Sequence, residues 1–304
     1  NALLSNHFGG EKRSGLRHLA LHGFGIVYCF SPQREFQTAD KGRGEQIFYD
    51  DKQVGGFKGA GGMIVVYIII ILIAVLVLYI VFLAICAVVI DPKREYETDS
   101  RFYRFLINSA ALCILKIVRI QVQTSGLEKI PNDTKPVFVC NHRSNFDPII
   151  TWYILRKWEP AFISKDANFK IPFYGRFIRK CCFMPIDREN PRKALKTINK
   201  AAELVKRSEV AIAVYPEGTR SKNGELQPFH NSVFKIAQKA GAPIVVLSIS
   251  GTEAIHKNYP FHASHVFLDV IDVLPADEIQ DMKTAAIGER VYASIDHRLQ
   301  TIGK

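Results

Sequence analysis

The sequence predicts an α/β domain with a mostly parallel central sheet covered by helices, preceded by one N-terminal transmembrane helix and an interfacial helix. Three observations lead to this expectation. One uncharged apolar run is long enough to cross a bilayer, and a shorter apolar run with basic ends follows it. Beyond residue 126, short and nearly continuous apolar runs alternate with helical patterns, as in a parallel sheet covered on both faces.

Residues 63–90 form the long apolar run, which contains no charged residue. About 20 residues are enough to cross a bilayer, so we expect a transmembrane helix here rather than a buried core element. A cleaved signal peptide is not expected, because the run is longer than a normal signal core and no small-x-small site follows it.

Basic residues flank this run unequally. Only Lys58 lies close before it, whereas four follow shortly after it: Lys93, Arg94, Arg101 and Arg104. Since positive charge gathers on the cytoplasmic side of a span, we expect a single-pass protein of the cell membrane whose domain from residue 91 onward faces the cytoplasm. The six cysteines form no C-x-x-C pair, which fits reduced thiols on that side.

The first 62 residues are rich in Gly and mixed charge and show no helical or strand periodicity. They also precede Met63, the first methionine of the chain. We expect residues 1–62 to be a disordered or non-native leader, and a genuine disordered extension is the alternative.

Residues 91–125 are expected to be a linker and an interfacial amphipathic helix. Within them, residues 101–120 have basic residues near both ends and only a short apolar stretch from Phe105 to Leu115. That stretch is too short to span, so it suits a helix that lies in the interface or docks on the domain. A second crossing is the alternative, and it would place the remaining chain on the opposite side.

The net charge of +11 indicates an anionic partner. Nucleic acid, an anionic membrane and an anionic substrate would each explain it, but no nucleic-acid-binding motif is present, so the membrane is favoured and no nucleic acid is expected. A basic face beside the anchor would hold the domain against anionic lipid. Its expected members are Lys157, Lys170, Arg176, Arg179 and Lys180.

Residues 126–304 are expected to form the α/β domain. Its predicted strands cover residues 136–140, 160–164, 181–186, 210–215, 243–249 and 265–274. Its predicted helices cover residues 149–157, 171–180, 191–208 and 231–241. In such sheets the functional residues gather in loops beyond the strand ends.

The strand-to-helix loop NHRSNFDP places His142 five residues before Asp147. A histidine can act as a general base at neutral pH, and a carboxylate on its other ring nitrogen would orient it. Local sequence leaves a second interpretation open, because an aspartate before Pro148 is also a usual helix cap.

Two further loops carry arginines that suit phosphate. VYPEGTRS turns sharply at Pro216 and Gly218 and offers Arg220, and MPIDREN offers Arg188. An ordinary turn and a surface salt bridge are the respective alternatives.

NHRSNFD, MPIDRE, YPEGTRS and APIVVLSI, in this order, resemble the four sequence blocks of the 1-acyl-sn-glycerol-3-phosphate acyltransferase family over roughly residues 100–290. The resemblance implies that His142 is the general base and Asp147 its partner. It also implies that the pocket for the acceptor's phosphate includes Arg188, Glu217, Gly218, Thr219 and Arg220. One departure is His230, which stands where the family often has a lysine.

This resemblance implies transfer of a fatty acyl group to the sn-2 hydroxyl of 1-acyl-sn-glycerol 3-phosphate (lysophosphatidic acid), which gives phosphatidic acid. The donor would be an acyl thioester of coenzyme A or acyl carrier protein, with no metal and no other cofactor. Membrane lipids and acyl carrier protein are the implied partners. Another lysolipid or glycerol 3-phosphate as acceptor is one alternative, and a non-catalytic membrane-tethered lipid-binding protein is another.

Overall fold

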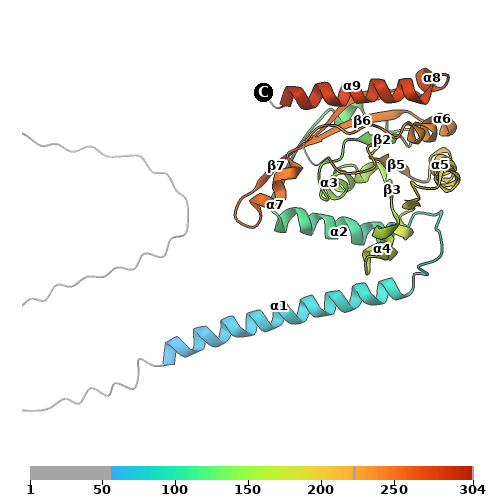
Figure 1. Cartoon of the computed structure of the whole chain (residues 1–304). Helices are drawn as coiled ribbons and strands as arrows, with labels where there is room; N and C mark the ends of the chain where they lie inside the picture. The colour runs from blue at the N-terminus through green and yellow to red at the C-terminus, as the bar shows by residue number, and fades with distance from the viewer. Residues whose placement is uncertain (1–55, 222–223, 303–304) are drawn as a thin grey trace, which may run out of the picture. The chain divides into compact units, whose positions relative to one another are not determined.

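A computed structural model describes residues 56–221 and 224–302, so most of the expected leader lies outside the described residues. Within this range the chain forms a seven-stranded sheet in the order β1-β7-β6-β2-β5-β3-β4 (Figure 1). The strands are β1 Ile120–Ser125, β2 Val137–Cys140, β3 Pro160–Lys165, β4 Met184–Ile186, β5 Ala211–Val214, β6 Ile244–Ser250 and β7 Ser264–Leu274.

All neighbouring strands pair in parallel except β6 with β7, which are antiparallel. Every residue of β2, β5 and β6 is buried, as expected for runs of Val, Ile and Ala in the middle of a sheet covered on both faces. The predicted α/β fold with a mostly parallel sheet is therefore confirmed.

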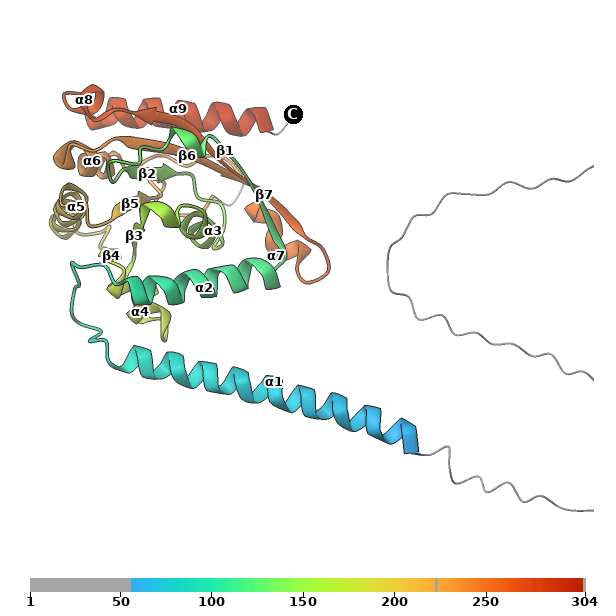
Figure 2. The same cartoon turned by 180° about the vertical axis from the view of Figure 1, so that it is seen from behind.

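Helices cover both faces of this sheet. Figures 1 and 2 show α9 on one face and α2 with α3 on the other. The helices are α1 Gly56–Val88, α2 Arg101–Ile117, α3 Asp147–Ile154, α4 Tyr174–Lys180, α5 Pro191–Lys206, α6 Lys235–Ala240, α7 Ile255–Asn258, α8 Ala276–Ile279 and α9 Thr284–Ile302. Short 3-10 turns are η1 Leu127–Lys129, η2 Arg156–Trp158, η3 Asp166–Lys170, η4 Asn231–Phe234 and η5 Thr252–Ala254.

Strand β1 and helices α7, α8 and α9 were not expected. Strand β1 lies ahead of the predicted domain start at residue 126, and it pairs with β7 at the edge of the sheet. Only Ile120 in it is buried, so its sequence IQVQTS lacks the apolar run of an inner strand. Helix α9 does show a helical pattern, since Ile287, Val291 and Ile295 are buried at intervals of four residues.

The strand expected over residues 181–186 is shorter than predicted. Cys181 ends α4, Cys182 has a positive φ of 59°, and β4 begins only at Met184. Both cysteines are fully buried, and their burial raises the pKa of each thiol. Both cysteines therefore belong to the core beside β4. Because they are apolar, the sequence pattern predicted a strand that already begins at residue 181.

Helix α1 has the length and composition of a membrane-spanning helix over Gly62–Val88, and its apolar side chains are exposed. This is compatible with the expected anchor. Its last turn contacts the domain, because the Tyr103 hydroxyl donates to the Cys86 carbonyl at 2.9 Å and Arg176 Nη1 donates to the Ala87 carbonyl at 2.9 Å. Carbonyls at a helix end lack partners within the helix, so Arg176 stabilises this end.

The five basic residues expected to face lipid all have partners inside the protein. Besides Arg176, Lys170 pairs with Asp166, Lys157 donates to Asn132, and Arg179 and Lys180 lie over the rings of Phe169 and Tyr96. Several of these side chains therefore make contacts within the protein, and the lipid-facing role expected of them stays a prediction.

Helix α2 docks on the domain through one side, as the sequence predicted. The buried residues of that side are Tyr103, Arg104, Leu106, Ala111 and Leu115. Large apolar side chains remain exposed elsewhere on the same helix, namely Phe102, Phe105, Leu112 and Ile117. Among the described residues α1 is the one helix suited to span a membrane, which disfavours α2 as a second crossing.

Arg104 was counted among the charges that flank the span, but it is buried in the domain, with 5% of its surface exposed. Its guanidinium binds both oxygens of Asp99 at 2.7 and 2.8 Å, donates to the Pro160 carbonyl, and lies 4.6 Å from the centre of the Trp152 ring. Arg104 therefore joins α2 to α3 and to the start of β3.

We expect Arg104→Ala to lower the free energy of unfolding by about 3–5 kcal/mol, because it leaves the buried Asp99 carboxylate without its partner. Thermal or denaturant unfolding of the whole chain in detergent measures this change. Arg101→Ala, at an exposed position on the same helix, is the matched control and should leave stability nearly unchanged. Equal effects of the two substitutions would contradict this role of Arg104.

Candidate active site

The loops that carry the predicted functional residues leave the same edge of the sheet. His142 follows β2, the 215–221 turn follows β5, and Arg188 follows β4. Strands β2, β5, β3 and β4 are parallel neighbours in that order, so their carboxyl ends lie at one edge. The fold therefore brings these three segments toward a common site.

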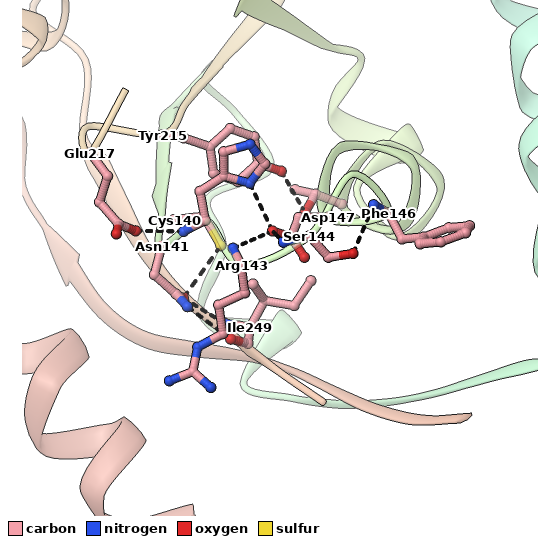
Figure 3. A network of polar contacts seen from close by, with 11 residues as sticks. Cys140, Asn141, Arg143, Ser144, Phe146, Asp147, Tyr215, Glu217 and Ile249 are labelled. Atoms are coloured by element: carbon pink, nitrogen blue, oxygen red, sulfur yellow. Dashed lines mark hydrogen bonds and ion pairs between the residues drawn. The ribbon is translucent and has the colours of Figure 1, made fainter. Parts of the chain in front are cut away.

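Asp147 lies at the centre of a cluster of polar contacts that Figure 3 shows. Its Oδ2 atom is 2.8 Å from His142 Nδ1 and accepts the backbone N–H groups of Arg143 at 2.6 Å and Ser144 at 2.7 Å. The Asp147 side chain is fully buried, whereas that of His142 is 17% exposed. The predicted pair is thus present, with the imidazole reaching the surface.

The helix-cap interpretation of Asp147 does not describe what the structure shows. Asp147 is the first residue of α3, the N-cap position belongs to Phe146, and no side-chain cap bond is made there. Its carboxylate instead holds the loop before the helix. Because Nδ1 of His142 binds a carboxylate, the neutral ring keeps its proton on Nδ1 and leaves the Nε2 lone pair as a base.

Tyr215 supports the imidazole from one face. The two rings stack with centroids 4.4 Å apart and an interplanar angle of 24°, and the Tyr215 hydroxyl donates to Thr151 Oγ1 at 3.2 Å (Figure 3). Burial raises the pKa of Tyr215 well above its ordinary value, so the group remains a neutral hydroxyl. Sequence reasoning missed this residue, although it is the aromatic position directly before Pro216.

Glu217 lies beside His142, but its carboxylate binds backbone. Oε1 accepts the N–H of His142 at 2.6 Å and Oε2 accepts the N–H of Gln227 at 2.9 Å. Burial raises the pKa of Glu217, and these two N–H bonds oppose the rise. Both oxygens are occupied, so the geometry favours Glu217 as a support for the His142 loop over a contact to substrate.

Asn141 fixes the other side of the loop. Its Nδ2 donates to the Ile249 carbonyl at 2.9 Å, and its Oδ1 accepts the Ile249 N–H at 2.8 Å. The Asn141 side chain thus extends the hydrogen bonding between β2 and β6 by one residue beyond the end of β2. The His142 carbonyl also accepts the Ser221 N–H at 2.9 Å, so the loops after β2 and β5 are tied to each other, and the loop after β2 is tied to strand β6.

Gly218 brings Arg188 to the 215–221 turn. It has a positive φ of 69°, and a β-carbon built on it would lie 3.5 Å from the guanidinium carbon of Arg188. Arg188, Thr219 and Arg220 are exposed. Within residues 56–221 and 224–302 neither arginine forms an ion pair, so both remain available to an anion.

The described residues contain no group of three or more His, Cys, Asp and Glu side chains placed to hold a metal ion. They do contain the oriented imidazole of His142, next to a turn that carries Arg220 and lies against Arg188. Chemically, this arrangement can remove a proton from a bound group while an anionic part of the same molecule is held nearby.

Comparison with known proteins assigns this region to a class. Residues 121–250, which include the strands and loops of the site, match the model of the acyltransferase family. Over these residues the chain is therefore similar to the acyltransferase family, as the resemblance of the four blocks indicated.

The curated relatives are more specific. A chloroplastic 1-acyl-sn-glycerol-3-phosphate acyltransferase of Brassica napus is 34% identical over 157 residues, 51% of this chain and 44% of the relative. The 1-acyl-sn-glycerol-3-phosphate acyltransferase of Escherichia coli is 29% identical over 143 residues, 47% of this chain and 57% of the relative. The chain thus spans about half the length of these relatives.

A solved structure shares the fold. The 1-acyl-sn-glycerophosphate acyltransferase PlsC from Thermotoga maritima superposes with a TM-score of 0.58 at 22% identity. The match covers 74% of this chain and 89% of that one, so most of the described fold has a counterpart there.

We expect Glu217→Gln to loosen the loop that carries His142. A glutamine keeps one acceptor oxygen but turns an NH2 group toward the other N–H, so the amide of His142 or of Gln227 should exchange its hydrogen roughly tenfold faster or more. Hydrogen exchange measured by mass spectrometry on the whole chain reports this. Thr219→Ala, on the same turn, is the control, and unchanged exchange in both variants would argue against the supporting role.

Proposed function

We propose that this chain is a membrane-bound O-acyltransferase that moves a fatty acyl group from an acyl thioester to the sn-2 hydroxyl of 1-acyl-sn-glycerol 3-phosphate. The observation that carries the proposal is the 2.8 Å contact between His142 Nδ1 and the buried Asp147 carboxylate. Beside this pair lies a turn that carries Arg220 and lies against Arg188, and neither arginine has an ion-pair partner in the described part of the chain. The names of the curated relatives support the same acceptor.

In the proposed reaction His142 Nε2 takes the proton of the acceptor hydroxyl as its oxygen attacks the thioester carbonyl. The tetrahedral intermediate then expels the thiolate, which receives the proton from the imidazolium, so one ester bond forms and one thioester bond breaks. Asp147 stabilises the imidazolium between these two proton transfers. No acyl-enzyme is needed, because the acceptor oxygen itself is the nucleophile.

The phosphate of the acceptor would bind Arg188 and Arg220. A guanidinium can bind phosphate through two parallel N–H bonds, and these contacts lie away from the reacting carbonyl. Binding energy from this remote group holds the hydroxyl at attacking distance, which raises the rate by orientation rather than by new chemistry.

The donor in this proposal is a thioester of coenzyme A or of acyl carrier protein, and no metal or other cofactor takes part. Another lysolipid or glycerol 3-phosphate could replace the proposed acceptor. A non-catalytic lipid-binding protein is the alternative from a different class, and it would not need the oriented His142 and Asp147 pair.

We also propose that α1 is a single-pass anchor in the cell membrane, with the domain on the cytoplasmic side and α2 against the lipid surface. Support comes from the 27-residue apolar stretch Gly62–Val88 and from Phe105 and Ile117, whose side chains are 64% and 65% exposed on α2. Exposed aromatic and aliphatic groups on a helix with basic ends suit the interface of a bilayer.

His142→Ala should lower the rate of acyl transfer to lysophosphatidic acid by about 10²- to 10⁴-fold, because the general base is lost. Asp147→Asn should give a loss of similar order through misorientation of the ring. A labelled acyl-transfer assay on the whole chain in mixed micelles, with several acceptors, measures both rates. His256→Ala, at an exposed position on α7, is the control. Full activity in His142→Ala would overturn the mechanism.

The position of α2 can be tested with spin labels on the whole chain in vesicles, in a background with Cys29→Ser and Cys113→Ser. A label at Phe105→Cys should collide more with oxygen, which concentrates in lipid, than with a water-soluble nickel complex. A label at Glu289→Cys, an exposed site on α9 across the sheet, should show the reverse order. The same order at both sites would mean that α2 does not lie on lipid.

A further inference from the structure

His230, which stands where the family often has a lysine, lies against the same turn as Arg188. A β-carbon built on Gly218 would be 2.9 Å from His230 Cδ2, 3.1 Å from His230 Nε2 and 3.5 Å from the guanidinium carbon of Arg188. The imidazole of His230 and the guanidinium of Arg188 come from two different loops and therefore both lie close to the same position beside Gly218.

The chain holds His230 in this place through its backbone. The His230 N–H donates to the Pro216 carbonyl at 2.9 Å, and its own carbonyl accepts the Val233 N–H at 3.2 Å as η4 begins. A side chain on Gly218 would displace the ring, so the glycine serves both its positive φ and this close approach.

Neither ring nitrogen of His230 has a hydrogen-bond partner in the described part of the chain. Desolvation lowers the pKa of the neighbouring Arg188, yet an arginine keeps its charge at neutral pH. A partly desolvated guanidinium and a second group that can become cationic repel each other while no anion is bound between them. A bound anion pairs with both groups and removes this repulsion.

The segments around the His230 ring carry few acidic groups that could neutralise the positive charge of the protonated ring. Arg188 and Arg220 are cationic, and the carboxylate of Glu217 is taken up by the N–H groups of His142 and Gln227. Glu225 lies on the segment that leads to the ring. On α9, which contacts Asn231 through Gly288, the next residue is Glu289.

We propose that His230 is a third ligand of the acceptor's phosphate and makes acceptor affinity depend on pH. This inference rests on the proposed function. In it, the protonated imidazole binds the phosphate together with Arg188 over Gly218, and the neutral imidazole leaves the phosphate to the arginines. A group with an ordinary pKa near 6.5 changes charge within the physiological range, whereas a lysine would not.

The sign of the effect follows from the charges. Bound phosphate favours the protonated imidazole, so affinity is highest below the pKa of the ring and falls as pH rises through it. The phosphate monoester has its own second ionisation near pH 6, and this acts on every variant alike. The contribution of His230 is therefore the difference between variants at the same pH.

The experiment compares the wild-type chain with His230→Lys and His230→Gln, in mixed micelles with lysophosphatidic acid as acceptor, from pH 6 to pH 8. Relative to His230→Lys, the KM of the wild type should be nearly equal at pH 6 and about three- to fivefold higher at pH 8, as for one exposed charge pair. His230→Gln should match the wild type at pH 8 and have the higher KM at pH 6. His297→Lys, which adds a charge at an exposed site on α9, is the control.

A second readout separates this inference from the proposed function. The dissociation constant of glycerol 3-phosphate, measured by calorimetry on the same whole chains, should show the same dependence on pH and on residue 230. That dependence without any acyl transfer would uphold the subsite and refute the enzyme. Acyl transfer with KM ratios and dissociation constants that do not change between pH 6 and pH 8 would overturn the role of His230.

Discussion

The geometry of the site depends on one buried oxygen atom. Oδ2 of Asp147 is bonded to His142 Nδ1 and to the N–H groups of Arg143 and Ser144, so it closes the loop between β2 and α3 on itself. A buried carboxylate is costly unless donors surround it, and here the donors are the residues whose position matters. The contact that orients the imidazole is thus also the contact that shapes the loop.

That loop would still be free to move as a unit if only Asp147 held it. Glu217 and Ser221, from the turn after β5, bind the backbone of His142, and Asn141 ties its start to β6. The stacked ring of Tyr215 then leaves the imidazole little freedom of rotation. The loops after β2 and β5, together with strand β6, therefore hold one imidazole in place, which is the preorganisation that acid–base chemistry requires.

Sequence patterns predicted the parts of this molecule that depend on local chemistry. The buried strands and the long apolar helix each have a local signature of burial or length. The His142–Asp147 pair was favoured over the helix-cap interpretation by the resemblance of the four blocks, because its spacing alone left both open. Strand β1 has none, because an edge strand with polar side chains is specified by its pairing with β7.

The same limit explains what was missed in the site. Whether Glu217 contacts substrate or backbone depends on which N–H groups reach it, and these belong to residues 142 and 227. Tyr215 supports His142 only because β2 and β5 are neighbours. The position of His230 over Gly218 likewise follows from a contact between separate segments, which spacing along the chain does not encode.

The two halves of the site differ in exposure, and the proposed reaction gives a reason. Asp147 is fully buried and the His142 side chain is 17% exposed, and the burial of the carboxylate strengthens their interaction. Arg188, Arg220 and His230 are exposed. A phosphate is strongly hydrated, and a fully buried subsite would cost more in desolvation than the added charge pairs return. In the proposed reaction, an open anion subsite beside the pair of His142 and Asp147 would let a charged lipid bind, react and leave while its chains remain in the membrane.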